Sequence, residues 1–350
     1  MRQLQYKTFS LKTHQKNWRI NRTNVCQFEL TFGCGFHCQH CYTDCYNKSR
    51  YIKNELETRQ VKYILDEVYN AGVIWLCFTG GDPLTRKDFL DVYSYAKDKG
   101  FIITIFSNGY SMTDEIIRYF KKKPPFALEI TLNAVTPDLY EKISQARGSF
   151  VKAMNGIGRI LKANLPLKIK TEVTKENLKE IPKISKFIKS LGLKPRPDAF
   201  VHARLDRDLA PCSLRISPEE VLSLDRKKAL TGCRRPSVAR SRVKTGLFNC
   251  AAGGGNGLHI DPYGNIVPCV CIREPRINLL REDIQEAHKM ILNWVRTRHF
   301  TYGTKCRNCP IRDYCYNCPG KAYLEKGSLE AAVDWFCELA HLNCIRRRQF

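Results

Sequence analysis

Apolar runs alternate with amphipathic stretches over residues 25 to 201, and this pattern constrains the fold more than any other feature of the sequence. Six runs are expected to be strands: 25–32, 73–79, 101–107, 126–132, 167–173 and 195–201. Apolar residues from Val61 to Val68 recur at helical spacing before Gly72, which predicts a helix there. Further helices are expected near 85–98, 112–122, 149–164 and 178–191. Strands that alternate with helices predict an α/β fold with a parallel sheet and right-handed crossovers. Six units at this size predict a partial (β/α)6 barrel.

The rest of the chain lacks this alternation. The predicted divisions are a basic N-terminal arm at 1–21, the barrel at 22–201, a basic linker at 202–248 and a cysteine-rich, loop-rich domain at 249–350. From Arg226 to Lys244 there are eight basic residues and no acidic one. In the last part, a hairpin is expected where the turn from Asp261 to Gly264 separates two short apolar runs.

The composition is that of a globular protein, with 43% hydrophobic and 26% charged residues. No apolar run is long enough to span a bilayer, and the basic N-terminus lacks the apolar segment of a secretory signal. We therefore expect a cytoplasmic protein without a membrane partner. Seventeen cysteines in such a chain argue against disulfides and for metal binding, because the cytosol keeps thiols reduced. The net charge of +24 indicates an anionic partner.

Three cysteines follow the first predicted strand directly. Cys34, Cys38 and Cys41 have the spacing C-x3-C-x2-C. Three thiolates at this spacing can hold three corners of a four-iron cluster and leave the fourth iron open for a substrate or cofactor. Zinc is the alternative, but zinc prefers paired C-x2-C knuckles and four ligands.

This spacing resembles that of the radical S-adenosylmethionine (SAM) superfamily, and motifs at later strand ends agree with the resemblance over residues 22–201. The resemblance implies that SAM contacts the aromatic residue after the third cysteine, the glycine-rich motif after the second strand, and polar residues that end the third and fourth strands. These are Tyr42; Thr79, Gly80, Gly81, Asp82 and Pro83; Ser107 and Asn108; and Thr131 and Asn133. The family more often has Glu where this chain has Asp82.

The C-terminal cysteines resemble the SPASM domain, which holds two auxiliary iron–sulfur clusters in many peptide-modifying radical SAM enzymes. One spacing departs from the family, because the last gap in the run Cys306–Cys318 is two residues instead of three. The resemblance assigns the first auxiliary cluster to Cys250, Cys269 and Cys318. It assigns the second to Cys306, Cys309, Cys315 and Cys337.

The first auxiliary cluster lacks a fourth ligand by this count. Cys271 lies two residues after Cys269, so that both face one side of a strand, and it is a candidate; Cys233 is another if the linker folds back. Otherwise this cluster has an open iron. Structural zinc knuckles are the alternative for the whole region.

The resemblance implies an enzyme with SAM and three [4Fe–4S] clusters as cofactors. It implies reductive cleavage of SAM to a 5′-deoxyadenosyl radical, which abstracts hydrogen from a peptide or protein and gives an oxidative change such as a crosslink. The expected partners are that substrate and an electron donor such as flavodoxin or ferredoxin. The basic arm, residues 226–244 and residues 346–348 could hold an acidic leader peptide. Alternatively these charges are solvated surface or a nonspecific nucleic-acid patch, although we expect no nucleic-acid partner.

Other functions remain open at this stage. Haem-biosynthesis relatives with the same C-terminal extension would act on a tetrapyrrole, whose propionates also suit basic residues. Sulfatase-maturating enzymes usually have an Asp where this chain has Val270, which counts against that function. An electron-transfer iron–sulfur protein is disfavoured by the SAM motifs. No catalytic acid or base is evident, and the candidates are Cys45, Glu129, Glu172, His202 and Arg204.

Overall fold

The computed structural model describes residues 5–19, 23–226, 246–248, 250, 252, 255 and 257–348. Its centre is one sheet with the strand order β6-β5-β4-β3-β2-β1-β7-β8-β9. The strands are β1 (Val25–Thr31), β2 (Trp75–Gly80), β3 (Ile102–Ser107), β4 (Ala127–Thr131), β5 (Leu167–Glu172), β6 (Arg196–Asp198), β7 (Gly257–Ile260), β8 (Asn265–Ile266) and β9 (Ile277–Asn278). Strands β1 to β6 pair in parallel with their sequence neighbours. The predicted α/β class and partial barrel are confirmed.

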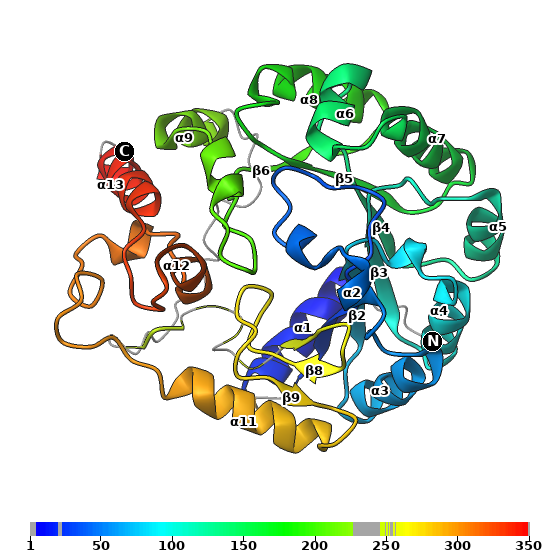
Figure 1. Cartoon of the computed structure of the whole chain (residues 1–350), viewed down its shortest axis with the longest axis horizontal. Helices are drawn as coiled ribbons and strands as arrows, with labels where there is room; N and C mark the ends of the chain where they lie inside the picture. The colour runs from blue at the N-terminus through cyan, green and yellow to red at the C-terminus, as the bar shows by residue number, and fades with distance from the viewer. Residues whose placement is uncertain are drawn as a thin grey trace.

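Helices surround the barrel strands on the outside, as Figure 1 shows for the arc from α3 to α8. The short α2 (Ser49–Ile52) is not part of this outer layer and has no buried residue. The outer helices are α3 (Thr58–Asn70), α4 (Phe89–Asp98), α5 (Asp114–Lys122), α6 (Pro137–Ser144), α7 (Ser149–Lys162) and α8 (Ile181–Ser190). Their apolar stripes are buried against the sheet, as for Val61, Ile64 and Leu65 of α3. Within the barrel and the segment before it, the N-terminal α1 (Tyr6–Arg19), α2 and α6 were not predicted from the sequence.

Helix α1 lies at the amino end of β2, within the expected basic arm. Trp75, the first residue of β2, donates from Nε1 to the Tyr6 hydroxyl at 2.9 Å. Its ring stacks on His14, with 4.4 Å between the ring centroids. The helix therefore packs at the end of the strands opposite to the expected reactive groups.

The expected hairpin is present, and it also extends the barrel sheet. Strands β7 and β8 pair antiparallel on either side of the predicted turn. Strand β7 in turn pairs in parallel with β1, so the C-terminal part of the chain continues the same sheet. A buried ion pair fixes this join, because Arg273 Nη1 lies 2.5 Å from Oε2 of Glu29 in β1.

The described residues of the expected linker include helical structure. Its residues form a 3₁₀ turn at Ala210–Leu214 and helix α9 (Pro218–Arg226). Helix α9 packs against α13 (Asp334–Arg348), and Figure 1 shows the two side by side. Arg215 forms a nearly buried ion pair with Glu325 of α12 (Pro319–Lys326) at 2.5 Å, and α11 (Ile284–Arg296) completes the C-terminal part. No helix among the described residues is long and apolar enough to cross a membrane.

Candidate active site

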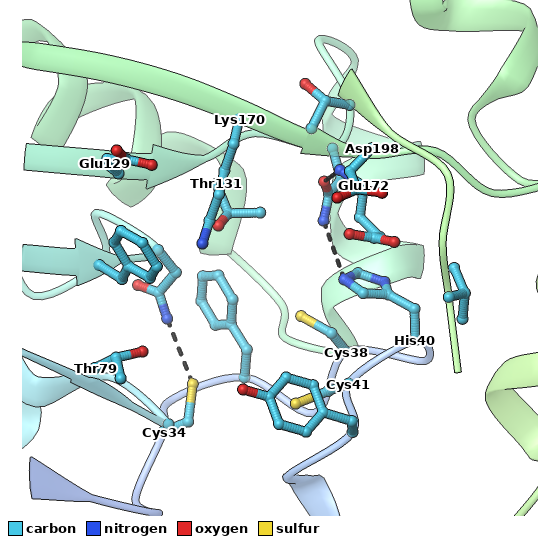
Figure 2. A pocket seen from close by; sticks show the side chains of 18 of the residues that line it. Cys34, Cys38, His40, Cys41, Thr79, Glu129, Thr131, Lys170, Glu172 and Asp198 are labelled. Carbon is cyan, nitrogen blue, oxygen red and sulfur yellow. Dashed lines mark hydrogen bonds between the residues drawn. The ribbon is translucent and has the colours of Figure 1, made fainter. Parts of the chain in front are cut away.

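The three cysteines of the first loop face one cavity of about 590 Å³ at the carboxyl end of the barrel strands (Figure 2). Asn47 holds this loop in place. Its Oδ1 accepts a hydrogen bond from the backbone N of Cys34 at 3.0 Å, and its Nδ2 donates to the carbonyl oxygen of Phe36 at 3.0 Å. Cys34, Cys38 and Cys41 all line the cavity, as the spacing predicted for a shared site.

The glycines after β2 allow the strand end to pack directly on the cysteine loop. Gly80 has a φ of +128°, and a Cβ at this position would lie 2.0 Å from the carbonyl oxygen of Thr31. A Cβ on Gly81 would lie 2.4 Å from the carbonyl oxygen of Gly33. Only glycine fits both places, because any side chain would push the cysteine loop away from the strand.

The Asp82 carboxylate forms hydrogen bonds with other groups of the protein. The side chain is fully buried and accepts hydrogen bonds from Ser107 Oγ at 2.8 Å, from the backbone N of Asn108 at 2.9 Å and from that of Leu84 at 3.0 Å. Burial raises its pKa to about 6, although these hydrogen bonds oppose the shift. Asp82 and Pro83 are not among the cavity-lining residues, so the structure places them behind the wall that Gly80 and Gly81 form.

The other residues predicted to contact SAM do line the cavity: Tyr42, Thr79, Gly80, Gly81, Ser107, Asn108, Thr131 and Asn133. Asn108 Nδ2 donates to Cys34 Sγ at 3.5 Å, which links the end of β3 to the cysteine loop. Asn133 Nδ2 lies 3.4 Å from Nε2 of His40, between the second and third cysteines. Figure 2 shows both contacts as dashed lines.

The donor set of this loop fits an iron–sulfur cluster. Burial raises the pKa of the Cys34 thiol to about 12 and raises those of Cys38 and Cys41, so the protein alone does not favour thiolates here. Bound iron would supply the missing positive charge and deprotonate them. Among the described residues, no three cysteine, histidine or acidic side chains converge as a single metal ion would require.

Charged side chains from β4, β5 and β6 form the opposite wall of the cavity. They are Glu129, Lys170, Glu172, Arg196 and Asp198, and Lys321 of α12 joins them. Arg196 Nη1 lies 2.9 Å from Glu129 Oε1. Glu172 is directly opposite Asp198 in the strand register, and burial together with this neighbouring carboxylate raises the pKa of Glu172 well above its usual range.

Lys170 stands out in this wall. Its ammonium group lies 3.9 Å from the centroid of the Phe106 ring and forms no ion pair with any described residue. Burial lowers its pKa, although Glu129 opposes the shift. A desolvated ammonium that faces a cavity is suited to an anionic group of a bound molecule.

The structure separates the catalytic candidates into two groups. Glu129, Glu172 and His202 line the cavity, whereas Cys45 and Arg204 do not. Arg204 pairs with Asp208. Lys170, Arg196 and Asp198 were not predicted from the sequence. Lys170 lies two positions before Glu172 on β5, so the two share a strand face, and this spacing could have indicated it.

The C-terminal cysteines lie in two groups. The interaction between Cys269 and Cys271 lowers the pKa of Cys269 and raises that of Cys271. Cys318 lies near both, because it adds to the raised pKa of Cys271 and Cys269 adds to its own. Burial raises the pKa of Cys306, Cys315 and Cys337, and neighbouring cysteines of this second group, Cys309 among them, add to the shift. Cys250 is exposed, and Cys233 lies outside the described residues.

Residues 28–188, which hold the cysteine loop and most of the barrel, match the family described as the Radical SAM superfamily. The chain contains a radical SAM domain. Chemistry of this class uses SAM and an iron–sulfur cluster, and the described cavity has the thiols and polar groups for both. The predicted resemblance to the radical SAM superfamily is thereby confirmed for this domain.

Curated relatives of this radical SAM protein carry two kinds of name. It is 28% identical to the "AdoMet-dependent heme synthase" of Nitratidesulfovibrio vulgaris over 332 residues, which is 86% of this chain and 88% of the relative. It is 31% identical to the enzyme of that name from Methanosarcina barkeri, but over only about half of each chain, 49%. The "Mycofactocin maturase MftC" of Mycobacterium tuberculosis is 26% identical over 69% of this chain and 63% of its own.

Solved structures show the same fold along nearly the whole chain. Streptococcus suis SuiB bound to the precursor peptide SuiA superposes with a TM-score of 0.70 and 15% identity over 95% of this chain and 81% of SuiB. The enzyme anSMEcpe with bound AdoMet and a peptide has a TM-score of 0.68 and 13% identity over 93% of this chain and 97% of its own. The likeness therefore includes the cysteine-rich C-terminal part as well as the barrel.

Proposed function

We propose that this protein is a radical SAM enzyme that abstracts a hydrogen atom from a peptide or protein and leaves an oxidative modification such as a crosslink. The observation that carries this function is the convergence of the three loop cysteines, the glycines after β2 and the polar ends of β3 and β4 on one cavity. The likeness to MftC in sequence supports a peptide substrate, and SuiB offers the same fold with a precursor peptide bound.

Cys34, Cys38 and Cys41 would hold a [4Fe–4S] cluster, with SAM on the iron that has no protein ligand. With an electron from a donor such as flavodoxin or ferredoxin, the cluster and SAM supply a 5′-deoxyadenosyl radical when bound. The protein's own part is to orient SAM and to keep water out. Backbone groups of Gly80 and Gly81 are exposed to the cavity for the methionine amino group, and Thr131 and Asn133 offer polar atoms for ribose or carboxylate.

We further propose two auxiliary [4Fe–4S] clusters in the C-terminal part, which makes three clusters in all. Cys306, Cys309, Cys315 and Cys337 form one group of donors, and Cys269 and Cys318 belong to the other. Such clusters can accept the electron that a substrate radical gives up, which favours a net oxidation.

A tetrapyrrole is the second candidate substrate, because the Nitratidesulfovibrio heme synthase matches 86% of this chain. The cations Lys170, Arg196 and Lys321 in the cavity wall would suit its propionate groups. A sulfatase-maturating function has less support, since Val270 lines the cavity where those enzymes usually have a catalytic Asp.

The test is anaerobic reconstitution followed by dithionite and SAM, with 5′-deoxyadenosine as the readout. A variant with Cys34, Cys38 and Cys41 changed to Ala should form none while it keeps about two-thirds of its iron, if three four-iron clusters are present. The two substrate classes are compared by adding either Fe-coproporphyrin III or a small acidic peptide encoded beside the gene. A porphyrin product would overturn the peptide substrate, and equal 5′-deoxyadenosine from the triple variant would overturn radical initiation at these cysteines.

A further inference from the structure

Three thiols from two distant segments meet beside the cavity. Cys269 and Cys271 lie on a tight turn that the hydrogen bond from the backbone N of Ile272 to the carbonyl oxygen of Cys269 closes at 3.2 Å. The first turn of α12 packs on both, because a Cβ added to Gly320 would lie 2.7 Å from Cys271 Cβ and 3.7 Å from Cys269 Sγ. Cys318 is the N-cap of this same helix, two residues before Gly320, and its charge and those of Cys269 and Cys271 act on one another.

His202 adds a nitrogen donor to this group. Its Nδ1 lies 2.9 Å from the carbonyl oxygen of Ala203, which can only accept, so Nδ1 carries the hydrogen. In the neutral ring Nε2 then has a free lone pair. This atom lies 3.8 Å from Cys271 Sγ, so the lone pair is directed at the thiol group.

The surroundings suit an anionic metal–sulfur group. The backbone N of Lys321 donates to Cys318 Sγ at 3.4 Å, at the positive end of α12. The Lys321 side chain lies near Cys271 and Cys318, where its charge favours thiolates. Cys250, which the family pattern assigns to this cluster, is exposed instead.

We propose that the first auxiliary cluster is ligated by Cys269, Cys271, Cys318 and the Nε2 atom of His202. This assignment rests on the proposed auxiliary clusters and replaces Cys250 in the ligand set. Soft thiolates select iron–sulfur clusters, and imidazole takes the place of cysteine on iron in Rieske centres. The arrangement Nδ1–H to backbone carbonyl is also the one that orients metal-bound histidines.

The proposed cluster site borders the substrate cavity. Cys271 and His202 both line the substrate cavity. The His202 ring lies 5.1 Å from that of Tyr42, centroid to centroid, and Tyr42 follows the third cysteine of the first loop. Two ligands of the auxiliary cluster would therefore form part of the wall that the substrate contacts.

The test uses the full-length Cys34→Ala/Cys38→Ala/Cys41→Ala variant, reconstituted with iron and sulfide, so that only auxiliary clusters contribute. Pulsed EPR of the dithionite-reduced protein, with and without ¹⁵N-labelled histidine, detects nitrogen bound to iron. We expect a histidine nitrogen coupling that His202→Ala abolishes. His202→Cys should keep the iron, lose the coupling and lower the reduction potential, because imidazole ligation raises it.

Three further variants check the sulfur ligands. Cys271→Ser should lose about half of the iron that remains in the triple variant, on the basis of two four-iron clusters. Cys250→Ser should leave the iron content and the EPR spectrum unchanged. Cys212→Ser is the matched control, because Cys212 packs against the same apolar group but lies outside the ligand set.

An auxiliary EPR signal without nitrogen coupling would overturn the histidine ligand. An effect of Cys250→Ser in place of Cys271→Ser would overturn the sulfur set. Absence of iron from the triple variant, or zinc in its place, would overturn the auxiliary clusters themselves. This outcome can be told from a wrong histidine ligand or a wrong sulfur set, because the protein would then give no cluster EPR signal.

Discussion

The position of Lys170 suits the binding of an anion but destabilises the folded protein. Its ammonium group is desolvated in the cavity wall and has no ion pair among the described residues, which costs folding free energy. Such a residue is retained where a bound molecule supplies the missing anion. Glu172 and Asp198, directly opposite each other in the register, crowd two carboxylates into the same wall.

We predict that Lys170→Met raises the free energy of unfolding by about 1 kcal/mol, because it removes a partly desolvated charge that has no ion pair among the described residues and hardly changes the length of the side chain. Binding or turnover of the substrate should fall in the same variant. Lys168→Met is the control, because Lys168 lies two residues earlier on β5 with its side chain 45% exposed, and it should change stability by less than about 0.5 kcal/mol. Urea unfolding of both variants checks this, and a less stable Lys170→Met protein would contradict it.

Asp82 leads to a prediction about pH. Its pKa in the folded protein is about 6, above the ordinary value of 3.8, so the folded state holds the proton more tightly. The stabilisation is complete below about pH 4 and is lost as the pH rises through 6, by up to about 3 kcal/mol. Asp82→Asn removes this pH-dependent contribution to the free energy of unfolding. The difference in unfolding free energy between the wild type and the variant should therefore fall from pH 4 to pH 7, and parallel curves would contradict the prediction.

At the scale of elements, the strands were predictable because each apolar run is long enough to form one buried parallel strand. The grouping of the polar strand-end residues around one site could also be predicted, because parallel strands end at the same edge of the sheet. Helix α6 was missed because its eight residues offer little periodicity. The pairing of β7 with β1 had no local signal, because it joins segments more than two hundred residues apart.

The packing of β2 on the cysteine loop gives a prediction for Gly81. A Cβ there would lie 2.4 Å from a backbone oxygen of the loop, so Gly81→Ala must displace the cysteines. We expect 5′-deoxyadenosine formation to fall by about 10²-fold, since small misplacements of reacting groups have effects of this size. Gly158→Ala on the exposed face of α7, where a Cβ meets nothing within 4 Å, is the control and should retain activity. Equal activity of the two variants would show that the loop tolerates the displacement.

At the scale of the whole molecule, two buried ion pairs join the cysteine-rich part to the barrel and to the segment that follows the barrel. Arg273 binds Glu29 of β1 through two hydrogen bonds, at 2.5 and 3.0 Å, and Arg215 binds Glu325 of α12. The charges themselves are visible in the sequence, but their pairing depends on the tertiary fold. These contacts place Cys271 and Lys321 in the wall of the same cavity as the first cysteine loop.

The pair of Glu29 and Arg273 gives the last prediction. Glu29 is completely buried, and Arg273 together with His259 holds its pKa at about 2 although burial opposes this. Arg273→Met leaves a buried carboxylate without its partner and should lower the free energy of unfolding by about 3–5 kcal/mol, whereas Arg273→Met with Glu29→Gln should recover most of that loss.

Lys289→Met, at the exposed pair with Glu286, serves as the control and should cost less than about 0.5 kcal/mol. The depressed pKa means that the stabilisation by Glu29 is present above about pH 4.5 and is lost as the pH falls towards 2. Arg273→Met lacks this stabilisation, so the difference in unfolding free energy between the wild type and the variant should shrink as the pH falls from about 5 towards 2. Purely additive effects of Arg273→Met and Glu29→Gln on the unfolding free energy would contradict the coupling, and with it the role of this pair in holding the two parts of the molecule together.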